Sequence, residues 1–175
     1  MKKIVFIYGL IAGLISVAMF FISHPTGEIN FENGMLIGYA TMVIAFSLIF
    51  FGVKNYRDNH LEGTITFGKA FQVGILVTLV ASVVYALGWE VYYNFIGNDF
   101  MAQYSKYYLD EMVKEGASAA EIEQARTQMQ STAEMYKNPV IRFAMTLMEI
   151  FPVGLIVTLI CAALLRKPQF LPKEA

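Results

Sequence analysis

Four stretches of this chain are apolar over about the length needed to cross the hydrocarbon core of a bilayer. A helix rises about 1.5 Å per residue, so roughly 20 apolar residues span a core of roughly 30 Å. The stretches lack the period-two alternation of barrel strands, and in lipid the helix is the other structure that satisfies the backbone. The pattern predicts a single membrane domain over residues 1–175, with helices over residues 4–22, 35–53, 70–93 and 140–165.

Basic residues are distributed unevenly between the two sides of such a protein. If the four helices alternate in direction, one side receives Lys2, Lys3, Lys54, Arg57, Lys69, Arg166, Lys167 and Lys173. Loops rich in lysine and arginine remain in the cytoplasm. We therefore expect a multi-pass membrane protein with both termini and residues 54–69 inside, and residues 94–138 outside.

Residues 94–138 form a soluble-looking segment between the third and fourth predicted helices. Apolar positions at helical spacing predict a helix over residues 99–115, capped by Asn98. Ser118 and Glu121 have the spacing of a capping box, which predicts the start of a second helix. We expect this insertion to be a helical hairpin.

The composition agrees with a membrane protein and excludes several classes of function. Of 175 residues, 57% are hydrophobic and 15% are charged, whereas about a quarter of a typical soluble domain is charged. The net charge of -1 lacks the basic surplus that nucleic-acid binding requires. A single cysteine, Cys161, and two histidines in opposite loops, His24 and His60, predict no metal site and no cofactor.

Every predicted membrane helix contains small residues four positions apart. This spacing lets helix backbones approach closely, which favours packing in lipid, and we predict packing within one chain in preference to a dimer face. The residues are Gly9 and Gly13, Gly34 and Gly38, Gly74 and Thr78, and Gly154 and Thr158. Residues 71–79 also resemble residues 151–159, which we interpret as coincidence because the two segments begin at different depths.

Glu149 is a charged residue well inside the fourth predicted helix. A charge at that depth costs at least about 2.5 kcal/mol, so such residues are functional candidates. Pro152 removes a backbone hydrogen bond and predicts a kink nearby. One hypothesis is a proton or cation site. The other, which we prefer at this stage, is a carboxyl that fastens helices through hydrogen bonds to Tyr or Thr hydroxyls.

Glu90 and Arg142 lie near the same end of the third and fourth predicted helices. A guanidinium can hold a carboxylate in bidentate fashion, so we expect an ion pair between them. Arg142 should extend toward the membrane surface and away from Glu149. We interpret the pair as an interfacial contact that orients helices.

Several segments, taken together, resemble the bacterial membrane proteins of domain-of-unknown-function family 4199. These segments are Lys2–Leu10, Gly34–Lys54 with Tyr56–Asp58, Gly63–Phe71, Trp89–Tyr93, Met135–Pro139 and Met148–Gly154. The resemblance spans nearly the whole chain. It implies an integral membrane protein and assigns no activity, so it gives no role to Glu90, Arg142 or Glu149.

Together with the resemblance, these observations predict an all-α, integral membrane four-helix bundle in a bacterial inner membrane. Both termini are expected inside, with an extracytoplasmic helical hairpin between helices three and four. No arrangement of Ser, His, Asp or Cys suggests a nucleophile, so we do not expect an enzyme. We favour a non-enzymatic scaffold or accessory component, in contact with the lipid bilayer and with another copy or another membrane protein. The alternative is a small oligomeric transporter or proton-coupled carrier that uses Glu149.

Overall fold

The computed structural model describes residues 1–23 and 31–172, and the regular elements of this part of the chain are helices, without strands. The all-α fold predicted from the sequence is therefore confirmed. The six helices are α1 (Lys2–Ser23), α2 (Phe31–His60), α3 (Phe67–Phe95), α4 (Phe100–Lys114), α5 (Ala119–Tyr136) and α6 (Pro139–Leu165).

Four of these helices, α1, α2, α3 and α6, are long and apolar enough to cross a membrane, and each covers one of the predicted spans. The largest difference from the prediction is in α2, which extends beyond its apolar run at both ends, from Phe31 to His60. An ion pair between Lys54 and Asp58, four residues apart on the helix, supports its last turns.

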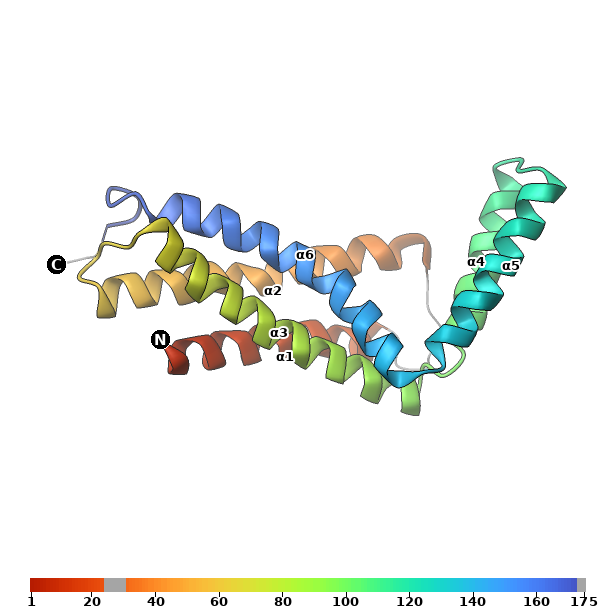
Figure 1. Ribbon diagram of the computed structural model, residues 1–175, viewed down its shortest axis with the longest axis horizontal. Helices are drawn as coiled ribbons and strands as arrows, with labels where there is room; N and C mark the ends of the chain where they lie inside the picture. Colours follow the sequence, from red (N-terminus) through yellow and green to blue (C-terminus); the bar gives the residue numbers. More distant parts are fainter. Residues whose placement is uncertain (24–30, 173–175) are drawn as a thin grey trace.

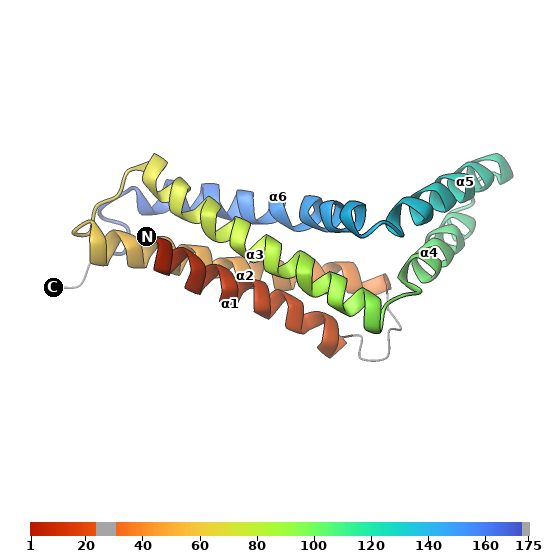
Figure 2. The ribbon, with the colours of Figure 1, turned by 60° about the horizontal axis from the view of Figure 1, so that its bottom comes forward.

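The helices are arranged as four long helices with a hairpin projecting from one end (Figures 1 and 2). The hairpin consists of α4 and α5, and we call this end of the long helices the hairpin end. The opposite end, where α1 begins and α6 ends, is the terminal end (Figure 1). The chain therefore passes between the two ends three times, as α1, α2 and α3, before the hairpin is inserted ahead of α6.

Two glycines bring α1 and α3 into close contact. A Cβ atom on Gly9 would lie 2.6 Å from the Cβ of Val80, and one on Gly13 would lie 2.6 Å from the Cβ of Val84. From Gly9 to Gly13 the contacted residue on α3 advances from Val80 to Val84, in the same direction along the chain. The two helices are therefore parallel. The close approach expected at Gly9 and Gly13 thus occurs within the chain.

The contact between α3 and α6 is built from a glycine and a threonine on each helix. Gly74 packs against Thr158, and Gly154 packs against Thr78. The two threonine hydroxyls are 3.0 Å apart and share a hydrogen bond. Because α3 and α6 are antiparallel, the two similar nonapeptides that contain these residues face each other at one level. The two segments begin at different depths, as expected, but they overlap along their length because they run in opposite directions.

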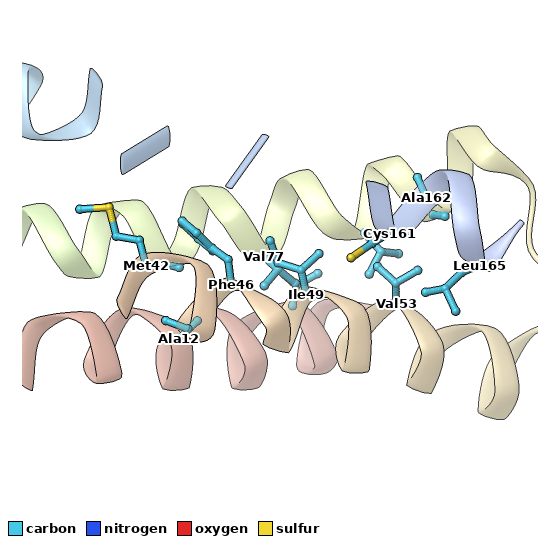
Figure 3. Close-up of a cluster of buried hydrophobic side chains, with 14 of the residues drawn as sticks. Ala12, Met42, Phe46, Ile49, Val53, Val77, Cys161, Ala162 and Leu165 are labelled. Carbon is cyan, nitrogen blue, oxygen red and sulfur yellow. The ribbon is translucent and has the colours of Figure 1, made fainter. Parts of the chain in front are cut away.

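An apolar core joins the four long helices (Figure 3). Phe46 and Ile49 of α2 lie beside Val77 of α3, and all three side chains are at most 1% exposed. Toward the terminal end, Cys161 and Leu165 of α6 close the core (Figure 3).

The capping box predicted from the sequence is present at the start of α5, and α6 is capped as well. Ser118 and Glu121 form both hydrogen bonds of a capping box at the start of α5. Asn138 caps α6, since its side-chain oxygen accepts a hydrogen bond from the amide of Val140 at 2.9 Å. Pro139 occupies the first turn of α6, where a missing N–H costs no helical hydrogen bond.

The start of α4 differs from the prediction. Asn98 does not cap this helix: its N-cap is Asp99, which makes no side-chain capping bond. The amide of Phe100 instead donates to the carbonyl of Gly97 at 3.0 Å, so a backbone turn takes the place of the cap. The hairpin prediction itself is confirmed.

Candidate functional site

Arg142 connects α6, α3 and the end of the hairpin. Its guanidinium donates to both carboxylate oxygens of Glu90, with 2.8 Å between Nε and Oε1, so the expected ion pair is present. It also donates to the carbonyl oxygen of Tyr136, the last residue of α5, at 3.1 Å. The guanidinium carbon lies 4.0 Å from the ring centre of Tyr93. Arg142 is buried, at 3% exposed, because these groups surround it.

Aromatic side chains complete the attachment of the hairpin. The indole N–H of Trp89 in α3 donates to the hydroxyl of Tyr136 at 2.6 Å. The rings of Trp89 and Phe100 are in edge contact, with centres 5.0 Å apart. Phe31, the first residue of α2, contacts Phe100 and Tyr104 of α4. The hairpin therefore rests on both α2 and α3.

Beneath the hairpin, the long helices leave a partly enclosed cavity of about 630 Å³. None of residues 31–41 of α2 is buried, so this part of α2 stands clear of the core and leaves the space open. All six helices contribute to the lining: Ser16, Met19, Phe20, Phe31, Asn33, Gly34, Met35, Ile37, Gly38, Tyr39, Thr41, Met42, Tyr85, Trp89, Phe100, Met101, Tyr104, Tyr107, Thr132, Tyr136, Met145, Thr146 and Glu149. The volume lies within the roughly 300–1,000 Å³ typical of small-molecule sites.

Gly34 and Gly38 border this cavity and do not pack against another helix. A Cβ atom at either position would meet no atom of the described chain within 4 Å. The packing role predicted for this pair is therefore wrong in this chain. The four-residue spacing shows only that one face of the helix carries small residues. Whether another helix packs against that face depends on how the helices are arranged in space.

Glu149 lines the same cavity. It is the eleventh residue of α6, which places it about 15 Å from the start of that helix at about 1.5 Å per residue. Its side chain is exposed, and it borders the cavity. The hydroxyl of Thr146, one turn earlier, donates to the carbonyl of Arg142 at 2.9 Å.

The carboxyl of Glu149 makes no hydrogen bond or ion pair with any other described residue. The preferred interpretation, in which Glu149 fastens helices through Tyr or Thr hydroxyls, therefore does not hold for the described part of the chain. Two nearby hydroxyls of the lining have other partners: that of Tyr136 accepts from Trp89, and that of Thr146 donates to the carbonyl of Arg142. This carboxyl is instead available to whatever occupies the cavity.

A second polar centre, which the sequence analysis missed, lies at the terminal end. Arg57 is fully buried. It donates to Asp58 at 2.7 Å and to the carbonyl oxygens of Phe170 and Leu171 after α6. The sequence did contain a signal for this centre, the adjacent Asp58. An arginine next to an acidic residue can pair with it inside the protein and need not face the lipid headgroups. This arrangement fixes the segment after α6 to α2.

The described residues contain no cluster of three or more metal-ligating side chains. His60 stacks on Tyr56, with ring centres 5.2 Å apart. His24, the other histidine considered above, lies outside the described residues, as does Lys173. The cavity lining in the described chain includes no Lys, Arg, His, Cys or Asp, which leaves Glu149 as its one carboxyl group.

A comparison with known protein families gives a match over residues 7–167, to the family described as "Protein of unknown function (DUF4199)". No curated protein and no solved structure matches the chain. The match covers most of the chain, including α2, α3, α6 and every residue of the hairpin. The chain therefore belongs to the DUF4199 family.

Proposed function

We propose that this protein is a non-enzymatic, multi-pass component of the bacterial inner membrane that binds a small molecule in the cavity beneath its hairpin. The observation that carries the proposal is the position of Glu149, whose carboxyl borders a cavity and has no partner in the described chain. An intramembrane carboxyl without a partner is costly, so it is retained where a ligand, water or an ion receives it. In this role the protein is an accessory component whose state depends on its ligand.

The proposed membrane orientation follows from charge. Seven described basic residues lie at the terminal end or on helix ends near it: Lys2, Lys3, Lys54, Arg57, Lys69, Arg166 and Lys167. Residues 94–138 carry seven acidic and four basic residues. By the positive-inside tendency, the four long helices form a transmembrane bundle with both termini in the cytoplasm and the hairpin outside.

The absence of catalysis is proposed from the chemistry of the cavity wall. General acid–base or nucleophilic catalysis requires a reactive group and a partner that orients or activates it. Glu149 has no such partner among the described lining residues, and the lining hydroxyl of Thr146 is engaged with the backbone. This wall suits binding better than it suits covalent chemistry.

The proposal is tested by filling the cavity. Gly38→Phe places a ring where a Cβ meets open space, and Gly68→Phe introduces the same ring at an open position at the start of α3, away from the cavity. We expect fragments that raise the melting temperature in lipid nanodiscs to lose their effect with Gly38→Phe and to keep it with Gly68→Phe. Fragments that act equally on both variants, or a library that yields no stabilising fragment, would contradict the proposal.

A proton-coupled carrier is the second candidate, favoured by the depth of Glu149 and by the uneven packing around it. The cavity lies beneath the hairpin, whereas Val53, Cys161 and Leu165 toward the terminal end are buried in the apolar core. A carrier would alternate between this state and one with the packing reversed. Uptake that depends on a proton gradient in proteoliposomes, and that is lost in Glu149→Gln, would support the carrier. The absence of any flux would leave binding as the function.

A further inference from the structure

We infer that the cavity takes an amphipathic cation, a molecule with an ammonium-type charge on an apolar body of drug-like size. This inference rests on the proposed function, because it specifies the ligand of the same cavity. The structural basis is one carboxyl without a partner in an otherwise uncharged wall that is rich in aromatic rings and methionines.

The distribution of acidic and basic residues in the cavity wall favours a positive group in the ligand. Glu149 is the single acidic residue in the described lining, and no basic residue lines the cavity. The nearest candidate counter-ion along α6, Arg142, already holds both carboxylate oxygens of Glu90. An anionic ligand would meet like charge with no compensating cation. A cation would gain an attraction that strengthens as water is displaced from the low-dielectric site.

The wall also suits the body of such a molecule. Nine of the 23 lining residues are aromatic and five are methionines. Aromatic faces attract ammonium groups that lie within about 6 Å of the ring centre. The protein already uses this interaction nearby, where the guanidinium of Arg142 lies over the ring of Tyr93. Methionine adapts to irregular apolar shapes, so the wall can fit several related ligands.

The position of Glu149 indicates how the ligand would be oriented in the cavity. Glu149 and Thr146 belong to α6, while Trp89 and Tyr136 line the cavity close to the hairpin. A charged group near Glu149 would leave the apolar body among the aromatic rings under the hairpin. The ligand would thus contact both α6 and the hairpin.

Trp89 provides a direct readout, because it is the one tryptophan of the chain and it lines the cavity. Its fluorescence is titrated in nanodiscs with benzyltrimethylammonium and with neopentylbenzene, in which a carbon replaces the charged nitrogen. The variants are Glu149→Gln and Met148→Gln. Met148 is 77% exposed and is not part of the cavity wall, so it is the matched control.

We expect saturable binding of the cation, weakened about tenfold or more by Glu149→Gln and unchanged by Met148→Gln. The neutral probe should bind equally to all three proteins. If Glu149→Gln weakens the binding of both probes equally, or of neither, the cation inference is overturned. Loss of both signals in Gly38→Phe would then still support a small-molecule site, so the failure of the two proposals can be distinguished.

Folding of the variants is checked by helical circular dichroism. If Glu149→Gln does not fold, the inference is tested on the unmodified protein alone, by comparing its affinities for the two probes. After correction for partition into empty nanodiscs, the cation must bind more tightly than its neutral isostere, and equal affinity would overturn the inference. If neither probe changes the fluorescence saturably, the inference is also wrong.

Discussion

At the scale of single residues, the charged side chains within the long helices differ in how they are neutralised. Arg142 is paired with Glu90, and Arg57 is held by Asp58 and two backbone carbonyls. Glu149 has neither kind of partner among the described residues. The first two residues hold elements together, and the third borders the cavity in which we propose that a ligand binds.

The Arg142–Glu90 pair is predicted to contribute strongly to stability. Arg142→Met leaves the Glu90 carboxylate without its partner and removes the link to the carbonyl of Tyr136, so it should destabilise the fold by about 3 kcal/mol. Thermal unfolding in detergent measures the loss. As a control, Lys137→Met breaks an exposed pair with Glu134 and should have little effect.

If Arg142→Met unfolds at the same temperature as Lys137→Met, the pair does not anchor the hairpin. The double variant Glu90→Gln with Arg142→Met separates two effects. It should be more stable than Arg142→Met alone, because it leaves no unpaired carboxylate.

The sequence predicts the Glu90–Arg142 pair but not the surroundings of Glu149. Glu90 and Arg142 each lie at the end of a predicted helix, so counting residues places them at one level. A partner for Glu149 depends on how far α2 stands from α6, and no local pattern determines that distance. The cavity therefore appears only once the helices are placed in space.

At the scale of elements, hydropathy and capping signals predict where helices occur, because both depend only on residues that are close together in the sequence. The contacts between helices are less predictable. Gly13 and Gly34 belong to the same four-residue pattern, yet Gly13 is in close contact with α3 while Gly34 borders the cavity. A small residue permits close approach, and the whole packing decides whether it happens.

This difference predicts opposite effects for one type of substitution. Gly13→Ala places a Cβ atom 2.6 Å from that of Val84 and should destabilise the protein by about 1–3 kcal/mol. Gly68→Ala, where a Cβ meets no atom within 4 Å, should be neutral or slightly stabilising, because alanine favours the helix. Melting temperatures in one detergent test the pair, and equal shifts would contradict the proposed α1–α3 contact.

The capping box of α5 predicts a pH-dependent contribution to the hairpin. Hydrogen bonds from the hydroxyl and amide of Ser118 lower the pKa of Glu121 below its usual value. A carboxyl whose pKa is lower in the folded state stabilises above its unfolded pKa, and this contribution is lost as the pH falls through the folded value. Ser118→Ala should therefore speed amide exchange in the first turn of α5 at pH 7.

At pH 3 the difference between Ser118→Ala and the unmodified protein should shrink without vanishing. The hydroxyl of Ser118 still accepts a hydrogen bond from the amide of Glu121 when the carboxyl is neutral. Hydrogen exchange followed by mass spectrometry measures both conditions. A difference that stays the same at the two pH values would show that the carboxylate does not contribute.

At the scale of the whole molecule, the protein is unevenly packed along its length. Cys161 and Leu165 are buried in the apolar core toward the terminal end. At the other end, residues of the hairpin line the cavity. Arg57 fixes the segment after α6 at the packed end, and Arg142 fixes the hairpin at the open end. One half therefore holds the helices together while the other half remains accessible to a ligand.

The proposed topology predicts which surfaces face the outside of the cell. In a Cys161→Ala background, a cysteine at Ala120 in the hairpin should react with an impermeant maleimide applied to intact cells. A cysteine at Asn59, at the terminal end of α2, should react only after the membrane is opened. Both positions are exposed, so access alone decides the result. Equal labelling in intact cells would contradict the orientation.

The central claim, that Glu149 borders an accessible cavity, is tested most directly by its reactivity as a cysteine. In the Cys161→Ala background, Glu149→Cys and Met148→Cys are treated in nanodiscs with methanethiosulfonate ethyltrimethylammonium, a small cation that reacts with the thiolate. A thiol that faces lipid remains protonated and unreactive. We expect rapid modification at position 149, slowed by Gly38→Phe, and little at position 148. Protection at position 149 equal to that at position 148 would contradict the account.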